Sequence, residues 1–238
     1  MSGHSHWAGI KHRKGINDAK RASIFTKFGR LITIAAREGG ANPDFNFKLK
    51  LAIEQARSVN MPRNNVERAI KRGTGELKDE AEIQEIMYEA YGPGNVAMLI
   101  KAATDNKNRT LGEIKNVLAK AGGKLVSAGS VNFLFKKMGV IDIGPSAGNM
   151  HDMELKAINA GAEDTSFAEG SLLVYCLPEK LGELKEKLER EDLGIISAGL
   201  SFVPLQRVRI DEKDKASYEN LLEKLDEQED IQEIFDNL

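Results

Sequence analysis

Apolar residues in the first third of the chain recur every three or four positions, the spacing of one face of an α-helix. A helix predicted over 19–38 places Phe25, Phe28 and Ile32 on that face, and Asp18 suits its N-cap. The same spacing predicts two further helices, at 47–59 and 62–72. Three short helices of this kind pack as a bundle more often than they form a helix-turn-helix, whose turn sequence is not recognisable here.

From residue 83 the pattern changes to short strands that alternate with helices. The turn-forming Gly92-Pro93-Gly94-Asn95 separates the first two strands. The alternation of Val131, Phe133 and Phe135 predicts that these three side chains share one face of a half-buried strand. The predicted strands are 83–91, 96–103, 131–135, 140–143, 171–177, 197–203, 205–210 and 231–234, and the predicted helices are 107–121, 150–159, one that starts at Pro178, and 213–227.

This order of elements predicts an α+β protein with an N-terminal three-helix domain followed by two ferredoxin-like α/β domains. If the last strand completes the sheet that begins near residue 83, one α/β domain is inserted in the other. The expected domains are 1–75, a basic helical nucleic-acid-binding domain; 83–136 together with 205–238, an α/β domain; and 137–204, the inserted α/β domain.

Charge is distributed very unevenly along the chain. Residues 1–75 carry 15 Lys and Arg against five Asp and Glu, whereas residues 76–238 carry 19 basic and 31 acidic groups. A basic module joined to an acidic body indicates a polyanionic partner for the module, and leaves the acidic body free to contact the ribosome or other proteins.

The basic groups of the helical domain are the candidate contacts. In the helix over 19–38 they fall largely opposite the apolar face, and few acids lie among them to form neutralising pairs. The predicted nucleic-acid-binding residues are Lys11, His12, Arg13, Lys14, Lys20, Arg21, Lys27, Arg30, Arg63, Arg68, Lys71 and Arg72.

Enzyme signatures are absent from the sequence. It contains no P-loop, no GxSxG, no HExxH and no paired CxxC. The single cysteine, Cys176, lies in an apolar run and is expected to be a small buried residue rather than a nucleophile. His151 stands at the start of a helix, where local capping explains it. The sequence therefore predicts no catalytic residues, no cofactor and no metal site.

No apolar run approaches the ~20 residues needed to span a bilayer, and the first 30 residues lack the apolar segment of a secretory signal. We therefore expect a cytoplasmic protein without a membrane partner.

Several long motifs, in order and at fixed spacing, resemble the YebC/PmpR family, which includes mitochondrial translational activators. They are GHSHW, IKHRK, DAKR, FTKFGRLI, AAREGG, NMPRNNVERAIKRGTGE, YEAYGPGNVA, NRT (108–110), GSVNFLF (129–135) and FVPL (202–205). The resemblance extends along the whole chain. It implies a helical domain and two α/β domains, one inserted in the other.

The resemblance leaves the nucleic-acid target open. Family members are described as probable transcriptional regulators that bind DNA, while others resemble translation factors that act at the ribosome. A DNA-binding regulator is one hypothesis, and a ribosome-associated factor that binds ribosomal RNA or tRNA is the alternative. The spread of charge over all three helices suits RNA recognised by shape and phosphate. A third hypothesis is an adaptor that binds proteins through its acidic body.

Overall fold

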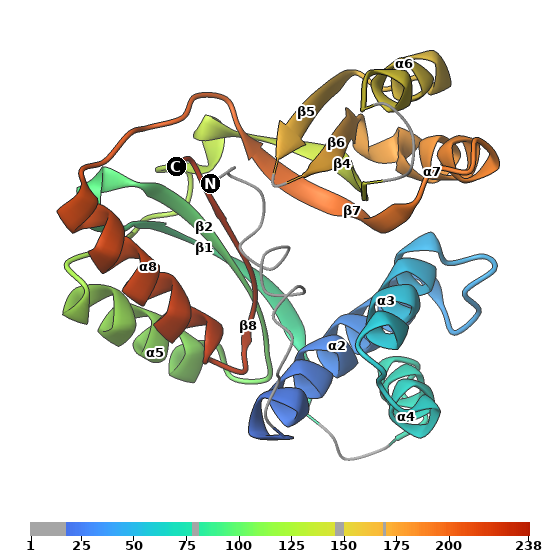
Figure 1. Cartoon of the computed structure of the whole chain (residues 1–238). Coiled ribbons are helices and arrows are strands. Elements are labelled where there is room, and N and C mark those ends of the chain that lie inside the picture. The colour runs from blue at the N-terminus through green and yellow to red at the C-terminus, as the bar shows by residue number, and fades with distance from the viewer. Residues whose placement is uncertain (1–17, 78–80, 146–149, 169) are drawn as a thin grey trace.

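The protein is described by a computed structural model that covers residues 18–77, 81–145, 150–168 and 170–238, with side chains from Arg21 onward. A helical domain and two α/β units lie around a common centre (Figure 1). Each α/β unit is a four-stranded antiparallel sheet with two helices packed on one face. The architecture confirms the predicted α+β class.

The helical domain consists of α2 (Asp18–Gly39), α3 (Phe47–Ser58) and α4 (Arg63–Gly73). The Asn46 side chain caps α3 by accepting a hydrogen bond from Leu49 N at 3.0 Å. The apolar faces of the three helices enclose a core that includes Phe28, Ile32 and Leu49. The hydrophobic periodicity of the sequence therefore predicted these helices to within about two residues.

The first sheet has the order β3-β1-β2-β8. It contains β1 (Gln84–Tyr91), β2 (Ala97–Thr104), β3 (Lys124–Val126) and β8 (Ile231–Asp236), with the short helix η1 (Pro93–Asn95) between β1 and β2. Helices α5 (Lys107–Lys120) and α8 (Glu212–Asp226) cover one face through a core that includes Leu118 and Tyr218. Because β8 pairs with β2, the C-terminal segment joins the sheet that begins at Gln84.

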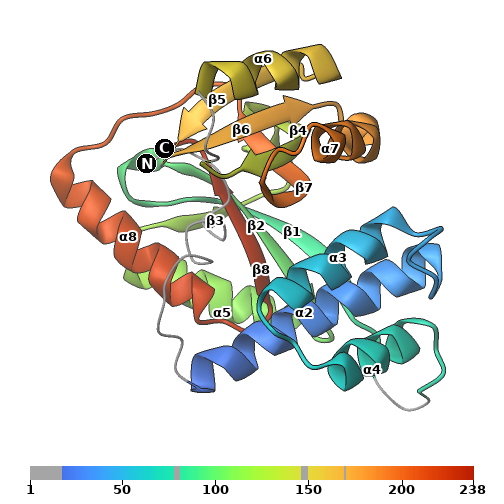
Figure 2. The same ribbon diagram turned by 45° about the vertical axis from the view of Figure 1, so that its right-hand side comes forward.

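The second sheet has the order β5-β6-β4-β7 and follows the βαββαβ order of a ferredoxin-like unit. Its strands are β4 (Phe135–Ile143), β5 (Asp164–Ala168), β6 (Ser171–Cys176) and β7 (Ile195–Pro204); its helices are α6 (Met150–Ala160), η3 (Pro178–Lys180) and α7 (Leu181–Arg190). Figure 2 shows α6 and α7 on the side of this sheet away from the first sheet. Since β4 starts at Phe135, the expected boundary between residues 136 and 137 falls inside a strand.

Two predicted strands are wrong. Residues 132–134 form a 3₁₀ turn, η2 (Asn132–Leu134), because the Glu89 carboxylate accepts hydrogen bonds from the backbone N–H groups of Val131 and Asn132 and bends the chain there. Residues 205–210 form no strand, because this segment crosses from the second sheet to α8 past the end of the first sheet. Strands β3 and β5 were not predicted, since each is short and has little apolar alternation.

Candidate nucleic-acid interface

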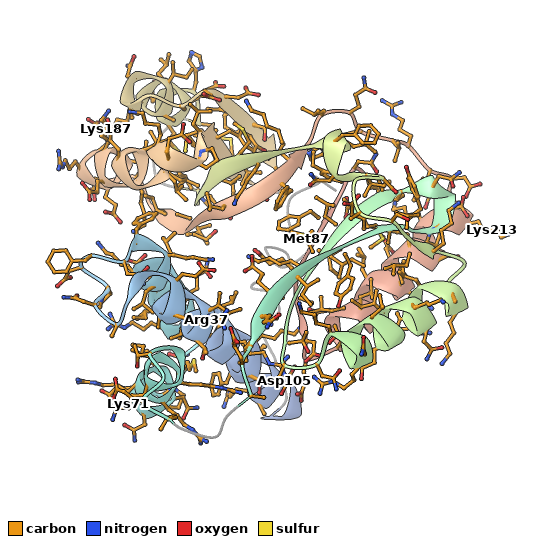
Figure 3. The ribbon with its side chains drawn as sticks, turned by 180° about the vertical axis from the view of Figure 1, so that it is seen from behind. Arg37, Lys71, Met87, Asp105, Lys187 and Lys213 are labelled. Atoms are coloured by element: carbon orange, nitrogen blue, oxygen red, sulfur yellow. The ribbon has the colours of Figure 1, made fainter. Side chains whose placement is uncertain are left out.

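Helix α4 presents the clearest outward-facing cations of the helical domain. Val66 and Ala69 are buried on one side of this helix, so Arg63, Arg68 and Lys71 lie on its exposed side. Figure 3 shows Lys71 on the outer side of the helical domain. The Arg63 side chain is 90% exposed, and its Nε donates to Glu67 Oε1 at 2.8 Å. These three residues are where the sequence predicted nucleic-acid contacts.

A groove of about 490 Å³ lies between α2 and α4. Phe25, Gly29, Met61 and Ala69 contribute apolar lining, and three arginines contribute charge. The fold thus brings together Arg30, Arg68 and Arg72, which the sequence predicted as contacts from two separate segments. An apolar groove with guanidinium groups can hold a nucleobase or sugar while it contacts phosphates.

The close packing of α4 on α2 shapes this groove. Thr33 Oγ1 donates to Ala69 O at 3.0 Å, and the site is buried. A Cβ at Gly73 would meet Thr33 O at 2.3 Å and Ala36 Cβ at 2.8 Å. Arg72 Nη2 donates to Ala81 O at 3.1 Å and ties the end of α4 to the segment that leads into β1.

Lys27 and Arg30 do not lie on an outward charged face as expected. Lys27 is only 3% exposed, and its ammonium contacts both the backbone O of Asp226 (2.6 Å) and its carboxylate (2.9 Å). Burial is the main cause that lowers the Lys27 pKa, and Asp226 opposes it. Arg30 Nη1 donates to Ala103 O and Glu229 O, each at 2.9 Å. These two cations therefore attach α2 to the first α/β unit.

Asp230 is the centre of this attachment. Its carboxylate is 4% exposed, and one of its oxygens pairs with Arg30. The other oxygen accepts hydrogen bonds from Arg109 Nη2 (2.8 Å), from the Thr104 hydroxyl (2.9 Å) and from the Thr110 hydroxyl. Burial by itself would raise the Asp230 pKa, but the bonds from Thr110 and Arg109 and the Arg30 charge outweigh it and hold the pKa at about 2. The contact therefore depends on an ionised Asp230.

Sequence reasoning missed Arg109 and Asp230. The available signal is the NRT motif at 108–110, but its sequence alone does not indicate a partner for Arg109. A carboxylate more than a hundred residues away cannot be paired with this motif by local pattern, because only the β2–β8 pairing brings them together.

Of the remaining predicted contacts, the structure describes the side chain of Arg21 alone. Arg21 is exposed near the start of α2. The side chains of Lys11, His12, Arg13, Lys14 and Lys20 lie outside the described residues. Among basic residues not predicted as contacts, Lys50 and Arg57 are exposed on α3, while Arg37 and Lys48 pair with Glu82 and Glu38 at 2.7 Å.

Helix α3 connects the helical domain to the second sheet. Lys185 Nζ on α7 lies 3.2 Å from Glu54 and 2.9 Å from Glu189. Gln55 Nε2 donates to Ala198 O at 3.4 Å. A cavity of about 250 Å³ lies between α3, α7 and β7. The helical domain therefore contacts both α/β units.

The structure also shows the surroundings of the single cysteine and of the potential metal ligands. Cys176 is buried as predicted, and burial is the first cause that raises its pKa to about 11, so the thiol stays protonated at neutral pH. No group of three or more His, Cys, Asp or Glu residues able to hold a metal ion occurs in the part of the chain that the structure describes. Within the same ranges, no helix is long and apolar enough to cross a membrane.

These features define a class of protein: a basic three-helix domain attached by buried ion pairs to two α/β units. Comparison with known proteins matches residues 5–76 to the TACO1/YebC N-terminal domain and residues 83–238 to the TACO1/YebC second and third domain. The chain belongs to the TACO1/YebC family.

Individual relatives agree along the full chain. A probable transcriptional regulatory protein of Pseudothermotoga lettingae is 45% identical over all of this chain and 93% of its own length. One from Aquifex aeolicus is 43% identical over all of this chain and 95% of its own length. The crystal structure of a conserved hypothetical protein from Aquifex aeolicus matches with a TM-score of 0.89 at 43% identity, covering 98% of this chain and 96% of the other.

Proposed function

We propose that this protein regulates gene expression by binding nucleic acid through its helical domain, with promoter DNA as the target. The observation that carries the proposal is the cationic surface of α4, Arg63, Arg68 and Lys71, next to the arginine-lined groove between α2 and α4. Lysine and arginine in such positions neutralise phosphates and release counterions. The relatives named probable transcriptional regulatory proteins support the regulatory role.

The interface proposed within the described residues is Arg21, Arg63, Arg68, Lys71 and Arg72. We include Lys11, His12, Arg13, Lys14 and Lys20 on the strength of the sequence alone. Lys27 is left out because its ammonium is paired with Asp226. Arg30 is left out as well, because it lines the groove but is paired with Asp230.

A second candidate function is that of a ribosome-associated translation factor. The observation that favours it is the concave shape of the arginine-lined site, which lies between two helices rather than on a protruding one. Readout of a DNA major groove requires an element that enters the groove, whereas a hollow suits the projecting bases and phosphates of folded RNA. The acidic α/β units would then face ribosomal proteins or tRNA.

The test compares binding of the full-length protein to promoter duplex, mixed-sequence duplex and purified ribosomes at physiological salt. Non-specific duplex binding of about 10⁻⁴ to 10⁻⁶ M is the baseline. Promoter binding tighter than mixed duplex by about a thousandfold would support the DNA regulator. Ribosome binding far tighter than the baseline, with both duplexes at baseline, would favour the translation factor.

The helical-domain variant Arg63→Gln/Arg68→Gln/Lys71→Gln should weaken binding to the preferred target and lower the salt slope by about 2 to 3. The matched control is Lys180→Gln/Lys187→Gln/Arg190→Gln, which removes three exposed cations from or beside α7. Equal binding by the two variants would contradict the proposed interface.

A further inference from the structure

Basic residues also gather within the acidic part of the chain. Residues 114–141 contain five lysines and no acid, and residues 193–210 contain two arginines and no acid. The rest of the chain after residue 75 carries 12 basic residues against 31 acidic ones. Such segregation creates a local surface that attracts a polyanion on a body that otherwise repels it.

The fold places the end of the first stretch, which carries Lys136 and Lys137, beside the second stretch. Strand β4 pairs with β7 so that Phe135 lies opposite Pro204. Just beyond, Leu205 N donates to Leu134 O at 2.9 Å. The chain crosses at this point from the second sheet toward the first (Figures 1 and 2). Both stretches therefore contribute to one surface at the seam between the α/β units.

Two large apolar side chains are exposed on this surface. Phe133 is 67% exposed and Leu205 is 62% exposed. Their neighbours are not exposed in the same way, since Val131 and Phe135 are buried and Leu134 packs against the same cluster. Residues 132–134 form a 3₁₀ turn in place of an alternating strand, which agrees with the exposure of Phe133 between buried Val131 and Phe135.

The backbone before Phe133 is held firmly. The Glu89 carboxylate accepts hydrogen bonds from the N–H groups of Gly129 (2.6 Å), Val131 (2.7 Å) and Asn132 (3.0 Å). Glu89 is 8% exposed, so a desolvated carboxylate is used to fix this turn. A fixed turn that exposes an aromatic ring loses little conformational entropy when a ligand stacks on that ring.

Both stretches also carry exposed cations within a few residues of their exposed apolar side chain. Lys136 is 54% exposed and lies 3.6 Å from Glu163. Arg207 and Arg209 are exposed on the segment that follows Leu205. Arg207 also lies near Tyr175: burial raises the pKa of the Tyr175 phenol, and the Ser166 hydrogen bond and the Arg207 charge oppose that rise. We define the seam surface as Phe133, Lys136, Leu205, Arg207 and Arg209.

We propose that the seam surface binds single-stranded nucleic acid, with a base stacked on Phe133 and phosphates contacting Lys136, Arg207 and Arg209. Exposed aromatic rings flanked by cations are the usual way to bind unpaired strands, because every base has a stacking face. A duplex keeps its bases stacked on one another and offers no free face to Phe133. The proposal adds a second contact surface to the nucleic-acid binding proposed above and rests on it.

The test measures binding of the full-length protein to a fluorescent 12-nucleotide oligo(dT) with one central 2-aminopurine. Phe133→Ala should weaken binding at least about fivefold and abolish the quenching of 2-aminopurine that stacking causes. Phe133→Trp should retain both. Arg207→Gln/Arg209→Gln should lower the salt slope by about 1.4.

Two variants serve as matched controls. Phe167→Ala removes a ring that is 48% exposed on β5 of the second sheet. Lys180→Gln/Arg190→Gln removes two cations from a surface rich in glutamates. Both should bind the strand as the unaltered protein does.

The outcomes separate this inference from the proposed function. If Phe133→Ala binds and quenches as Phe167→Ala does, the inference is overturned and the seam surface is left to a protein partner. Should the helical-domain variant lose duplex binding in the same series, the proposed function stands without the seam. If seam and helical-domain variants alike leave all binding unchanged, both fail.

Discussion

At the scale of single residues, Asp230 shows how one buried carboxylate can join distant parts of a chain. It receives Arg30 from the helical domain, Thr104 from β2, and Arg109 and Thr110 from α5, and it lies in the segment before β8. A buried charge without such partners would cost several kcal/mol. With four donors, the charge is satisfied and the contact is directional.

Asp230→Asn should lower the free energy of unfolding by about 2 kcal/mol at pH 7. The folded-state pKa of Asp230 is about 2, below the ordinary 3.8, so its contribution is present above pH 3.8 and is lost as the pH falls through 2. Urea unfolding at several pH values should therefore show the variant and the unaltered protein converging in acid.

Asp105→Asn is the control for this prediction. Asp105 also pairs with Arg109, at 3.0 Å, but its side chain is 35% exposed. Screening limits an exposed pair to under about 1 kcal/mol. A similar loss in both variants would mean that burial of Asp230 is unimportant.

At the scale of elements, α2 is buried on two sides. One face packs in the bundle core with Phe28 and Ile32, and the other contacts the first α/β unit through Lys27 and Arg30. Sequence periodicity identified the apolar face correctly. It cannot distinguish a polar face that meets solvent from one that contacts another domain, because the spacing of polar residues is the same in both cases. This is why Lys27 and Arg30 were expected on the surface.

The contact between α2 and α4 leads to a prediction at Gly73. Gly73→Ala should destabilise the protein by about 1 to 3 kcal/mol, because the added methyl would press on Thr33 O. Gly112→Ala in α5, where nothing lies within 4 Å, should instead stabilise by up to about 1 kcal/mol. Thermal unfolding of the two variants compares them directly, and shifts in the same direction would refute the packing argument.

At the scale of the whole molecule, the helical domain is attached at two places. Lys27 and Arg30 connect it to the first α/β unit, and α3 meets α7 and β7 of the second through Glu54 and Gln55. Helix α4, which carries the proposed nucleic-acid contacts, takes part in neither of these sets of ion pairs. The cationic surface is thus held in a defined orientation to the seam surface.

Lys27→Gln/Arg30→Gln should loosen this attachment and lower the unfolding free energy by about 3 kcal/mol, because Asp226 and Asp230 lose partners in a desolvated contact. Small-angle X-ray scattering should show a larger radius of gyration. Arg63→Gln/Arg68→Gln removes the same number of charges from the exposed side of α4 and should leave the shape unchanged. An unaltered scattering profile in the first variant would show that the ion pairs do not hold the domain.

The sequence by itself determined the helices, most strands and the separation of charge, since each depends on local periodicity, capping or composition. It also located the exposed cations of α4, because Val66 and Ala69 mark the buried side of that helix. Tertiary structure alone decided that Lys27 and Arg30 are largely buried and that Phe133 is exposed. Burial of the first two requires Asp226 and Asp230, some 200 residues away, and the exposure of Phe133 requires the Glu89 carboxylate that bends the chain. Such long-range pairings leave no periodic signal in the sequence, because they depend on which strands and helices pack together.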